Sequence, residues 1–254
     1  MSSYFYIDHI RHLTAANLKT RYRNTWAGLM WVALNPILQF GTQALVFNFI
    51  LKLQIQNYLL FLVTGLLPWT FIFQSLDMNS MTIVNNARTL KSIPVSPLLF
   101  VISQTLDNLI NFGVAFAVVA IPILYYFKIN FLMVLIMLIP LASLAIGVTA
   151  LSFLFSILQT FYQDTRFVLT FSLGLIFYLT PIFYSENLVP MEFRWALYLN
   201  PFYLWISPFQ NLFTEQLSIL FWQKLAFSCL TSAAMVIFVG LYWRMRKGDL
   251  YYKL

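Results

Sequence analysis

The stretch that decides the fold runs from Phe131 to Ile157 and reads FLMVLIMLIPLASLAIGVTALSFLFSI. It contains no charged residue and no histidine. A helix rises about 1.5 Å per residue, so about 20 apolar residues cross the roughly 30 Å of hydrocarbon in a bilayer. The stretch exceeds that length and carries no charged face, which predicts a membrane-spanning helix.

The whole chain shares this character. Of its 254 residues, 61% are hydrophobic and only 9% are charged, whereas about a quarter of the residues of a soluble protein are charged. This composition excludes a soluble or disordered protein, and the single cysteine, Cys229, excludes a disulfide framework. The net charge of +7 lies at the ends of uncharged stretches, which indicates contact with anionic lipid rather than nucleic acid. We predict one all-α integral membrane domain over residues 1–254.

Five further stretches are apolar, nearly free of charge and long enough to cross a membrane, which predicts six transmembrane helices. The predicted spans are 30–51, 58–76, 105–127, 131–157, 167–185 and 222–243. A seventh uncharged stretch, 195–214, contains Asn200-Pro201 and Ser207-Pro208, and both prolines are expected to break a helix. Broken backbone is tolerated at membrane depth only against protein. We therefore expect a pair of short re-entrant or gate helices between the fifth and sixth spans.

The basic residues predict the orientation. Eleven Lys and Arg residues fall in the two terminal segments and the alternate loops between them, and four fall in the remaining loops. The eleven are Arg11, Lys19, Arg21, Arg23, Arg88, Lys91, Arg166, Arg244, Arg246, Lys247 and Lys253. Basic residues concentrate on the cytoplasmic side, so both termini are expected in the cytoplasm. The first 23 residues are polar and amphipathic, so no cleavable signal peptide is expected.

Residues 1–25 are predicted to form an amphipathic helix at the inner membrane surface. Its apolar side chains recur near one face, at Ile7, Ile10, Leu13 and Leu18. Two interpretations stay open: an anchor for the first span, or a surface that also contacts a cytoplasmic partner.

The cytoplasmic loop 77–96 is predicted to hold a second small helix, from about Ser80 to Ser92, which ends before Pro94. Its apolar face comprises Ile83, Val84, Ala87 and Leu90. Arg88 and Lys91 lie near its C-terminal end, where the helix dipole favours positive charge. Ser96 and Pro97 then begin the third span. The helix either contacts a partner or rests on lipid headgroups.

A polar stripe marks the third span, because Gln104, Asp107, Asn108 and Asn111 recur at spacings of three and four. Such a stripe faces protein or water in a membrane. It predicts either hydrogen bonds between helices or the inner mouth of a pathway.

The central parts of the predicted spans contain no acidic or basic residue, which argues against a proton relay or sodium site. The sequence also contains no phosphate-binding loop, no H-E-x-x-H motif and no nucleophile beside a base. We therefore expect no cofactor in this chain, and any energy for uphill transport must come from another subunit.

The external segment 186–221 contains Glu186, Glu192 and Glu215 together with many aromatic residues. Long ordered loops usually carry function. The segment is interpreted as a gate at the outer mouth, or as an interfacial aromatic layer with no moving part. Aromatic residues make up 19% of the chain, and those inside spans either line a sugar pathway or pack against lipid and protein.

Two stretches resemble a known family. The first runs from Arg21-Tyr22-Arg23 through Gly28-Leu29-Met30-Trp31 to Leu34-Asn35-Pro36. The second, more specific, runs from Thr180-Pro181-Ile182-Phe183-Tyr184-Ser185 through Val189-Pro190 and Arg194-Trp195 to Tyr198-Leu199-Asn200-Pro201. Both are similar to ABC-2 type permeases, and among these to the exporters of lipid-linked polysaccharides such as O antigen, capsule and teichoic acid. The chain departs from the family at the aromatic run 202–206.

The resemblance implies a homodimer in the bacterial cytoplasmic membrane that pairs with two copies of a separate ATPase, which binds ATP and Mg²⁺. It implies a lipid-linked glycan as substrate and a glycan channel between the two copies. The residues it assigns to coupling with the ATPase are Arg21, Arg23, Arg88, Leu90, Lys91, Ile93 and Pro94. Our channel or gate candidates, from this resemblance and the polar stripe, are Gln104, Asp107, Asn111, Pro181, Tyr184, Asn200, Pro201, Tyr203 and Trp205.

Three alternatives stay open from the sequence: an ABC-2 permease for a drug or lipid, a membrane enzyme acting on lipid-linked sugars, and a passive channel. The enzyme requires an acid or base that faces a cavity. The acidic candidates are Asp107, Asp164, Glu186, Glu192 and Glu215.

Overall fold

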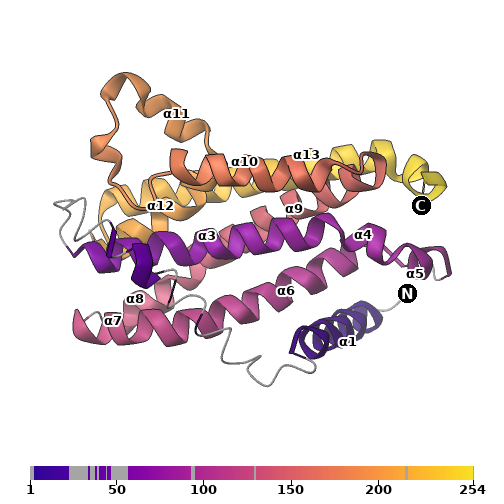
Figure 1. The fold of residues 1–254 in the computed structure, drawn as a ribbon, viewed down its shortest axis with the longest axis horizontal. Coiled ribbons are helices and arrows are strands. Elements are labelled where there is room, and N and C mark those ends of the chain that lie inside the picture. The colour runs from indigo at the N-terminus through magenta and orange to yellow at the C-terminus, as the bar shows by residue number, and fades with distance from the viewer. Residues whose placement is uncertain are drawn as a thin grey trace.

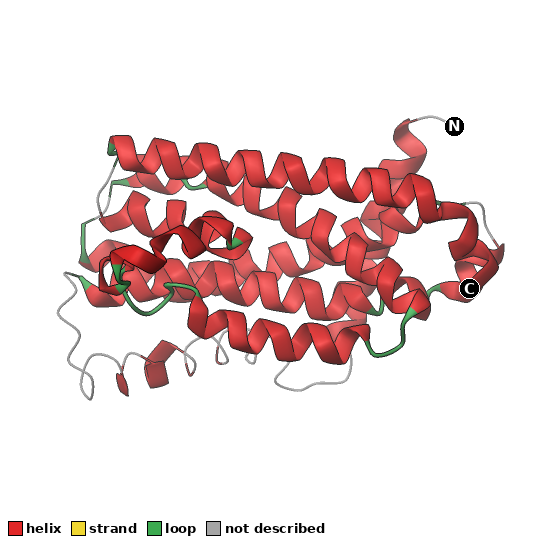
Figure 2. Ribbon diagram, turned by 90° about the horizontal axis from the view of Figure 1, so that it is seen from above, coloured by secondary structure: helices red, strands yellow, loops and turns green. Residues whose placement is uncertain are grey.

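Helices run side by side along one axis in the computed structural model of the chain (Figure 1). The structure describes residues 3–22, 57–92, 95–128, 130–214 and 217–253, together with positions 34, 38, 40–43 and 45–46. Within these residues every regular element is a helix, joined by short loops (Figure 2). The N-terminal helix and the end of the C-terminal helix lie at the same end of the bundle (Figure 1).

Four described segments are long and apolar enough to cross a membrane. They are Tyr58–Ser80 (α3), Pro97–Val119 (α6, Pro97–Ala115, and most of the π-helical turn η2, Phe116–Ala120), Phe131–Phe161 (α8, Phe131–Ile136, and α9, Leu138–Phe161) and Ile219–Leu250 of α13 (Ile219–Lys253). They correspond to the second, third, fourth and sixth predicted spans. The third begins at Pro97 and covers 97–119 rather than 105–127, so the buried Asp107 lies near its middle and the expectation of uncharged span centres is wrong there. The third continues as α7 (Ile121–Tyr126). The first predicted span, 30–51, lies mostly outside the described residues.

The helix at the fifth predicted span is shorter than predicted. Helix α10 covers Thr165–Leu179, 15 residues, or about 22 Å, whereas the sequence predicts 167–185. It ends because Pro181 forces the preceding residue, Thr180, out of the helical region, and Thr180 is extended with φ −93° and ψ 131°. Residues 180–185 are therefore loop.

The sixth predicted span and the predicted C-terminal tail form one helix. Helix α13 has 35 residues, or about 52 Å, which exceeds the hydrocarbon thickness by about 20 Å. Its last turns are fixed at one point, because Leu250 is fully buried in an apolar cluster with Ile83 and Leu90 of the 77–96 loop. The tail thus packs with this loop.

The predicted helix from Ser80 to Ser92 is wrong as a single element. Helix α3 extends to Ser80, and the loop forms α4 (Thr82–Asn85) and α5 (Ala87–Ser92). The break falls at Asn86, whose side-chain amide donates to the Thr82 carbonyl at 2.8 Å. An Asn side chain that bonds nearby backbone in this way competes with the helical hydrogen bonds.

Helix α1 (Ser3–Tyr22) packs against α6. Ile10 and Leu13 contact the apolar cluster of the 77–96 loop, while Ile7 is exposed. Polar contacts join the two helices, since Thr14 Oγ1 and Asn17 Nδ2 both donate to Ser103 Oγ, at 3.3 Å each. The face of α1 that touches the protein is therefore partly polar.

Candidate gate and coupling surfaces

The external segment folds into four short helices. They are η3 (Glu186–Leu188), η4 (Met191–Phe193), α11 (Arg194–Leu199) and α12 (Pro201–Thr214). The predicted break at Asn200-Pro201 is present, and Asn200 Oδ1 accepts from the Phe202 amide at 3.0 Å. The predicted break at Ser207-Pro208 is wrong, because α12 continues through Pro208. Neighbouring helices compensate such a break when they enclose the helix.

Helix α12 is enclosed by protein on every side. All its residues from Phe202 to Phe213 are buried, and it packs against α3, α9 and α13. The prediction that the 195–214 segment is buried against protein is therefore confirmed for α12 and wrong for α11, where only Leu197 is buried and Trp195 and Leu199 are exposed. The aromatic run 202–206 thus lies in the core, which explains why aromatic residues occupy it.

Trp205 is the central contact of α12. Its side chain is 0% exposed, and its Nε1 donates to Ser232 Oγ of α13 at 2.8 Å. Ser143 Oγ of α9 lies 3.2 Å from the same hydroxyl. The indole also fits against Gly147, where a Cβ atom would meet Trp205 Cε2 at 2.6 Å. Trp205 therefore joins three helices at one point.

The loop after α10 is held by side chains of the external segment. Gln210 Nε2 donates to the carbonyls of Pro181 and Ile182, at 3.0 and 3.3 Å. Asn200 Nδ2 donates to Thr180 Oγ1 at 2.8 Å. The predicted gate residues Pro181 and Asn200 are thus brought together. Tyr184, also predicted there, donates instead to the Tyr178 carbonyl at 3.3 Å.

A charged network joins the external segment to the start of α13. Lys224 Nζ contacts Glu186 Oε2 at 2.9 Å and Asn211 Oδ1 at 3.0 Å. Tyr203 also donates to Glu186, and its ring lies 5.6 Å from Lys224 Nζ. We call Glu186, Tyr203, Asn211 and Lys224 the outer network. The Lys224 side chain is only 6% exposed, so the network buries a positive charge beside a partly exposed carboxylate.

Sequence reasoning selected Tyr203 but missed its connection to Lys224 and Glu186. One signal was available. Lys224 is the only basic residue in the first turns of the last span, and a buried lysine requires a partner of opposite charge.

The Glu186 carboxyl has a lowered pKa. Burial acts to raise it, but hydrogen bonds from Tyr203 and Lys224 and the charge of Lys224 outweigh burial. Because the folded state lowers this pKa below the ordinary value of 4.5, the carboxylate stabilises the fold above pH 4.5. That stabilisation is lost as the pH falls through the lowered pKa.

We expect acidification below pH 4.5 to reduce the melting temperature of the wild-type protein more steeply than that of Glu186→Gln. The Gln side chain has no proton to gain in this range, so its network does not titrate. Thermal unfolding in detergent across a pH series measures the difference. Parallel curves for the two proteins would show that Glu186 does not contribute.

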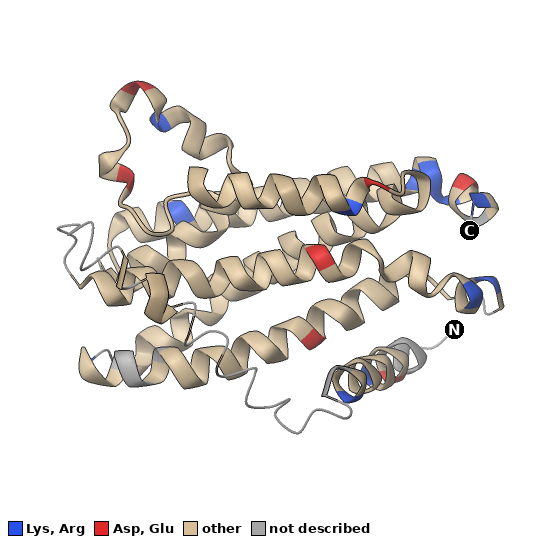
Figure 3. Ribbon diagram, in the orientation of Figure 1, with Lys and Arg blue, Asp and Glu red and all other residues tan. Residues whose placement is uncertain are grey.

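At the opposite end of the bundle, α5, α1 and the end of α13 all carry basic residues (Figure 3). Arg88 and Lys91 are exposed on α5. Leu90 is buried and anchors α5 in the apolar cluster. Arg21 lies in the last turn of α1, and its side chain is outside the description. Arg23, Ile93 and Pro94 lie outside the described residues, so their predicted role stays a prediction.

The polar stripe of α6 lies mainly at a helix contact. Asp107, Asn108 and Asn111 are buried, and Asn108 Nδ2 donates to Ser75 Oγ of α3 at 3.3 Å. Gln104 Nε2 donates to Asp107 Oδ2 at 3.1 Å. Of the two interpretations of the stripe, the structure shows helix-to-helix hydrogen bonding. Gln104 also lines an open polar cavity, so a pathway role for it stays a prediction.

No metal site is found in the part of the chain that the structure describes, since no three His, Cys, Asp or Glu side chains are grouped there. Of the acidic residues that the enzyme alternative would need, Asp107 is fully buried and Glu186 pairs with Lys224. Asp164 is exposed in the turn between α9 and α10.

Comparison with known proteins agrees with this architecture. Two proteins of Klebsiella pneumoniae named "O-antigen export system permease protein RfbA" are each 27% identical to the chain over 248 residues, which is 94% of both chains. A protein of the same name from Myxococcus xanthus is 25% identical over 215 residues, 84% of this chain and 82% of the relative. These names are those of transport permeases rather than enzymes. The profile of the ABC-2 type transporter family matches residues 8–214, so this multi-pass membrane chain belongs to the ABC-2 type transporter family.

Proposed function

We propose that two copies of this chain form the membrane channel of an ATP-driven exporter of lipid-linked polysaccharide of the O-antigen class. The observation that carries the proposal is the similarity to O-antigen export permeases over 94% of both chains. Each chain would contribute six spans. ATP and Mg²⁺ are bound by a separate ATPase, two copies of which attach to the dimer.

The distribution of charged residues supports an ATPase-binding surface at one end of the bundle and a gate at the other end. The exposed basic side chains of α5 lie at the end of the bundle that holds both termini, which the basic-residue asymmetry assigns to the cytoplasm. The external segment and the start of α13, which together carry the outer network, lie at the opposite end (Figure 1). The ATPase would thus act on one end of the bundle, and the gate would open at the other end in the bacterial cytoplasmic membrane.

Deletion of the gene in its host tests the function. We expect surface polysaccharide to disappear and lipid-linked polysaccharide to accumulate inside the cell, with recovery of both when the gene is supplied again. Electrophoresis of surface glycan and extraction of lipid-linked glycan measure the two pools. Unchanged surface glycan, with altered sensitivity to a drug or altered lipid distribution, would instead favour a drug or lipid permease.

Reversing charge at both Arg88 and Lys91, to Glu, is expected to uncouple ATP hydrolysis from export. Both side chains are exposed on α5, so the reversal should not disturb the fold. A docked ATPase, however, would face two negative charges in place of two positive charges, and the charge complementarity of the interface would be lost. The measurements are the amount of chain in the membrane, ATP hydrolysis and glycan export. Lys128→Glu, an exposed basic residue at the other end of the bundle, is the matched control. Normal export in the double variant would contradict docking at α5.

A further inference from the structure

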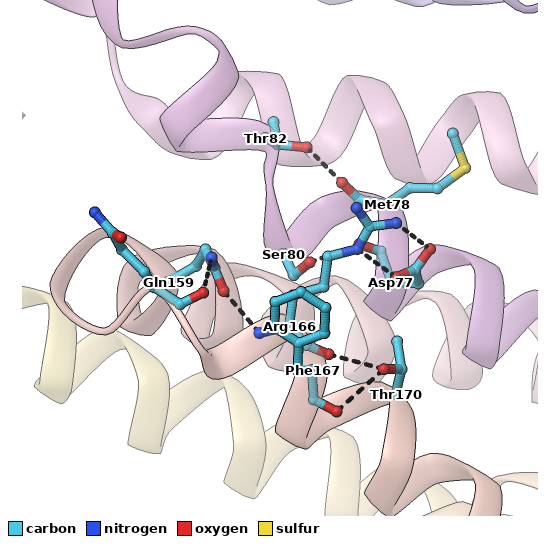
Figure 4. Close-up of polar contacts among 9 residues, drawn as sticks. Asp77, Met78, Ser80, Thr82, Gln159, Arg166, Phe167 and Thr170 are labelled. Carbon is cyan, nitrogen blue, oxygen red and sulfur yellow. Dashed lines mark hydrogen bonds and ion pairs between the residues drawn. The ribbon is translucent and has the colours of Figure 1, made fainter.

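A two-pronged ion pair connects α3 with the first turn of α10. Arg166 Nε contacts Asp77 Oδ1 at 2.8 Å, and Arg166 Nη2 contacts Asp77 Oδ2 at 3.0 Å (Figure 4). The backbone amide of Arg166 also donates to Gln159 Oε1 of α9 at 2.7 Å. We call Asp77, Gln159 and Arg166 the inner network. A planar guanidinium held by both oxygens of one carboxylate is fixed in orientation as well as in distance.

The inner network lies next to the base of the 77–96 loop. Asp77 is three residues before the end of α3, and α4 and α5 follow directly. The Ile83 amide of α4 donates to Ser156 Oγ of α9 at 3.1 Å, and the Ile83 side chain is fully buried. Continuous backbone and buried contacts therefore connect α5 with Asp77, so a displacement of α5 reaches the ion pair.

Helix α10 packs against the bundle along one face, where Ile176 and Phe177 contact the core and the Phe177 ring lies 5.5 Å from the Trp69 ring of α3. In α10 only Leu169 and Leu173 are buried, whereas Phe167 and Phe171 are exposed. Its inner end is tied by Arg166, and the loop at its outer end is tied to α12 through Gln210. A helix that packs along one face and is tied by polar contacts at both ends moves as a rigid element, so a displacement of its inner end reaches its outer end.

The surroundings of the ion pair leave room for this displacement. A cavity of about 370 Å³, lined by Asn17, Gln104 and Arg166 among others, opens between α1, α3, α6 and α10. A second cavity of about 520 Å³, lined by Ala87, Gln159 and Arg166 among others, opens toward α5. Arg166 lines both, so its guanidinium is held by its polar partners rather than by close packing.

We propose that Asp77 and Arg166 are positioning residues that transmit displacement of the 77–96 loop through α10 to the external gate. This inference rests on the proposed function, because it takes the ATPase to act on that loop. The two-pronged contact of the Arg166 guanidinium with Asp77 resists separation of α10 from α3, and it also resists rotation of α10 about its axis. The two helices therefore move together at this point.

The test follows nucleotide-dependent exposure of the gate rather than glycan export. In a Cys229→Ser background, Met191→Cys places a thiol on η4, where Met191 is 81% exposed. The chain is reconstituted with its partner ATPase, and the rate of maleimide labelling is measured with and without ATP and vanadate. We expect nucleotide to change this rate when Asp77 and Arg166 are intact.

Asp77→Asn and Arg166→Lys are each expected to reduce the nucleotide-dependent change at least about fivefold, the lower end of typical coupling between two sites. Arg166→Lys keeps the positive charge but removes the two-pronged guanidinium contact. If only the positive charge at position 166 mattered, this variant would respond to nucleotide as the wild type does. The exchanged pair, Asp77→Arg with Arg166→Asp, should restore part of the response. Arg246→Lys is the control, because it alters an exposed ion pair with Asp249 at the same end of the bundle.

A full labelling response in both single variants would overturn the proposal, and so would the absence of any response in the wild-type complex. A wild-type response that depends on the ion pair, in a complex that exports no glycan, would refute the polysaccharide function and leave the role of the pair intact. The experiment therefore distinguishes failure of the polysaccharide-export proposal from failure of the proposed role of Asp77 and Arg166.

Discussion

Replacing Glu186 with Ala is expected to destabilise the protein by about 3 kcal/mol, because it leaves the ammonium group of Lys224 without its carboxylate partner. Removing one member of a buried ion pair costs about 3 to 5 kcal/mol. The lower end applies here, since Glu186 is 29% exposed whereas Lys224 is 6% exposed. Thermal or denaturant unfolding in detergent measures the loss, and release of a small solute from liposomes measures whether the gate leaks.

The matched control for this variant is Glu192→Ala, which removes an exposed carboxylate from η4 of the same segment. A double variant, Glu186→Ala with Lys224→Met, separates the causes. It should recover part of the stability, because the uncompensated charge is gone. If the two single losses simply add, Glu186 and Lys224 do not interact.

Replacing Trp205 with Ala is expected to have the largest effect of any substitution considered, about 3 to 5 kcal/mol. The indole is fully buried where α9, α12 and α13 meet, so its removal leaves a cavity and deprives Ser232 of its donor. The loss falls on packing within the folded protein rather than on insertion of the spans. The amount of the variant chain in the membrane should therefore stay close to that of the wild type although its free energy of unfolding is lower. Glycan export should fall, or the membrane should leak small solutes.

Gly147 provides the independent check on this packing. A Cβ at this position would lie 2.6 Å from Trp205 Cε2 and 2.7 Å from Ser232 Oγ. Gly147→Ala should therefore destabilise the protein by about 1 to 3 kcal/mol, and a smaller ring in Trp205→Phe should relieve part of that cost. Gly174→Ala is the control, because nothing lies within 4 Å of a Cβ at that position. Equal stability of the Gly147 and Gly174 variants would show that the contact between Trp205 and Gly147 is not tight.

Much of the fold could be predicted because hydrophobic length is a local property. The segments Tyr58–Ser80 and Phe131–Phe161 are recognisable as spans, since each is long, apolar and nearly free of charge. The break at Asn200 was equally local, because it needs only the proline that follows. Two errors have tertiary causes: α12 continues through Pro208 because neighbouring helices enclose it, and α13 extends past the predicted span because Leu250 is buried against the 77–96 loop. Two others have local causes, because Pro181 ends α10 and the Asn86 side chain separates α4 from α5.

The candidate gate and helix-contact residues were predictable only where the type of a side chain limits where it can lie in a membrane protein. The α6 stripe had to face protein or water, and Tyr203 and Trp205 lay in a segment marked by prolines. The partners of these residues could not be read from the chain, because Glu186 and Lys224 are 38 residues apart and Asp77 and Arg166 are 89 apart. Each of these four charges looks like an ordinary loop or span-end residue by itself.

The amino-acid sequence by itself determined that this protein lies in a membrane as a helical bundle, since that property depends on the length and composition of each segment alone. Only the tertiary structure decided which helices pack against each other. Buried polar groups must find partners once water is excluded, and the folded chain, not the order of residues, brings Lys224 to Glu186 and Arg166 to Asp77.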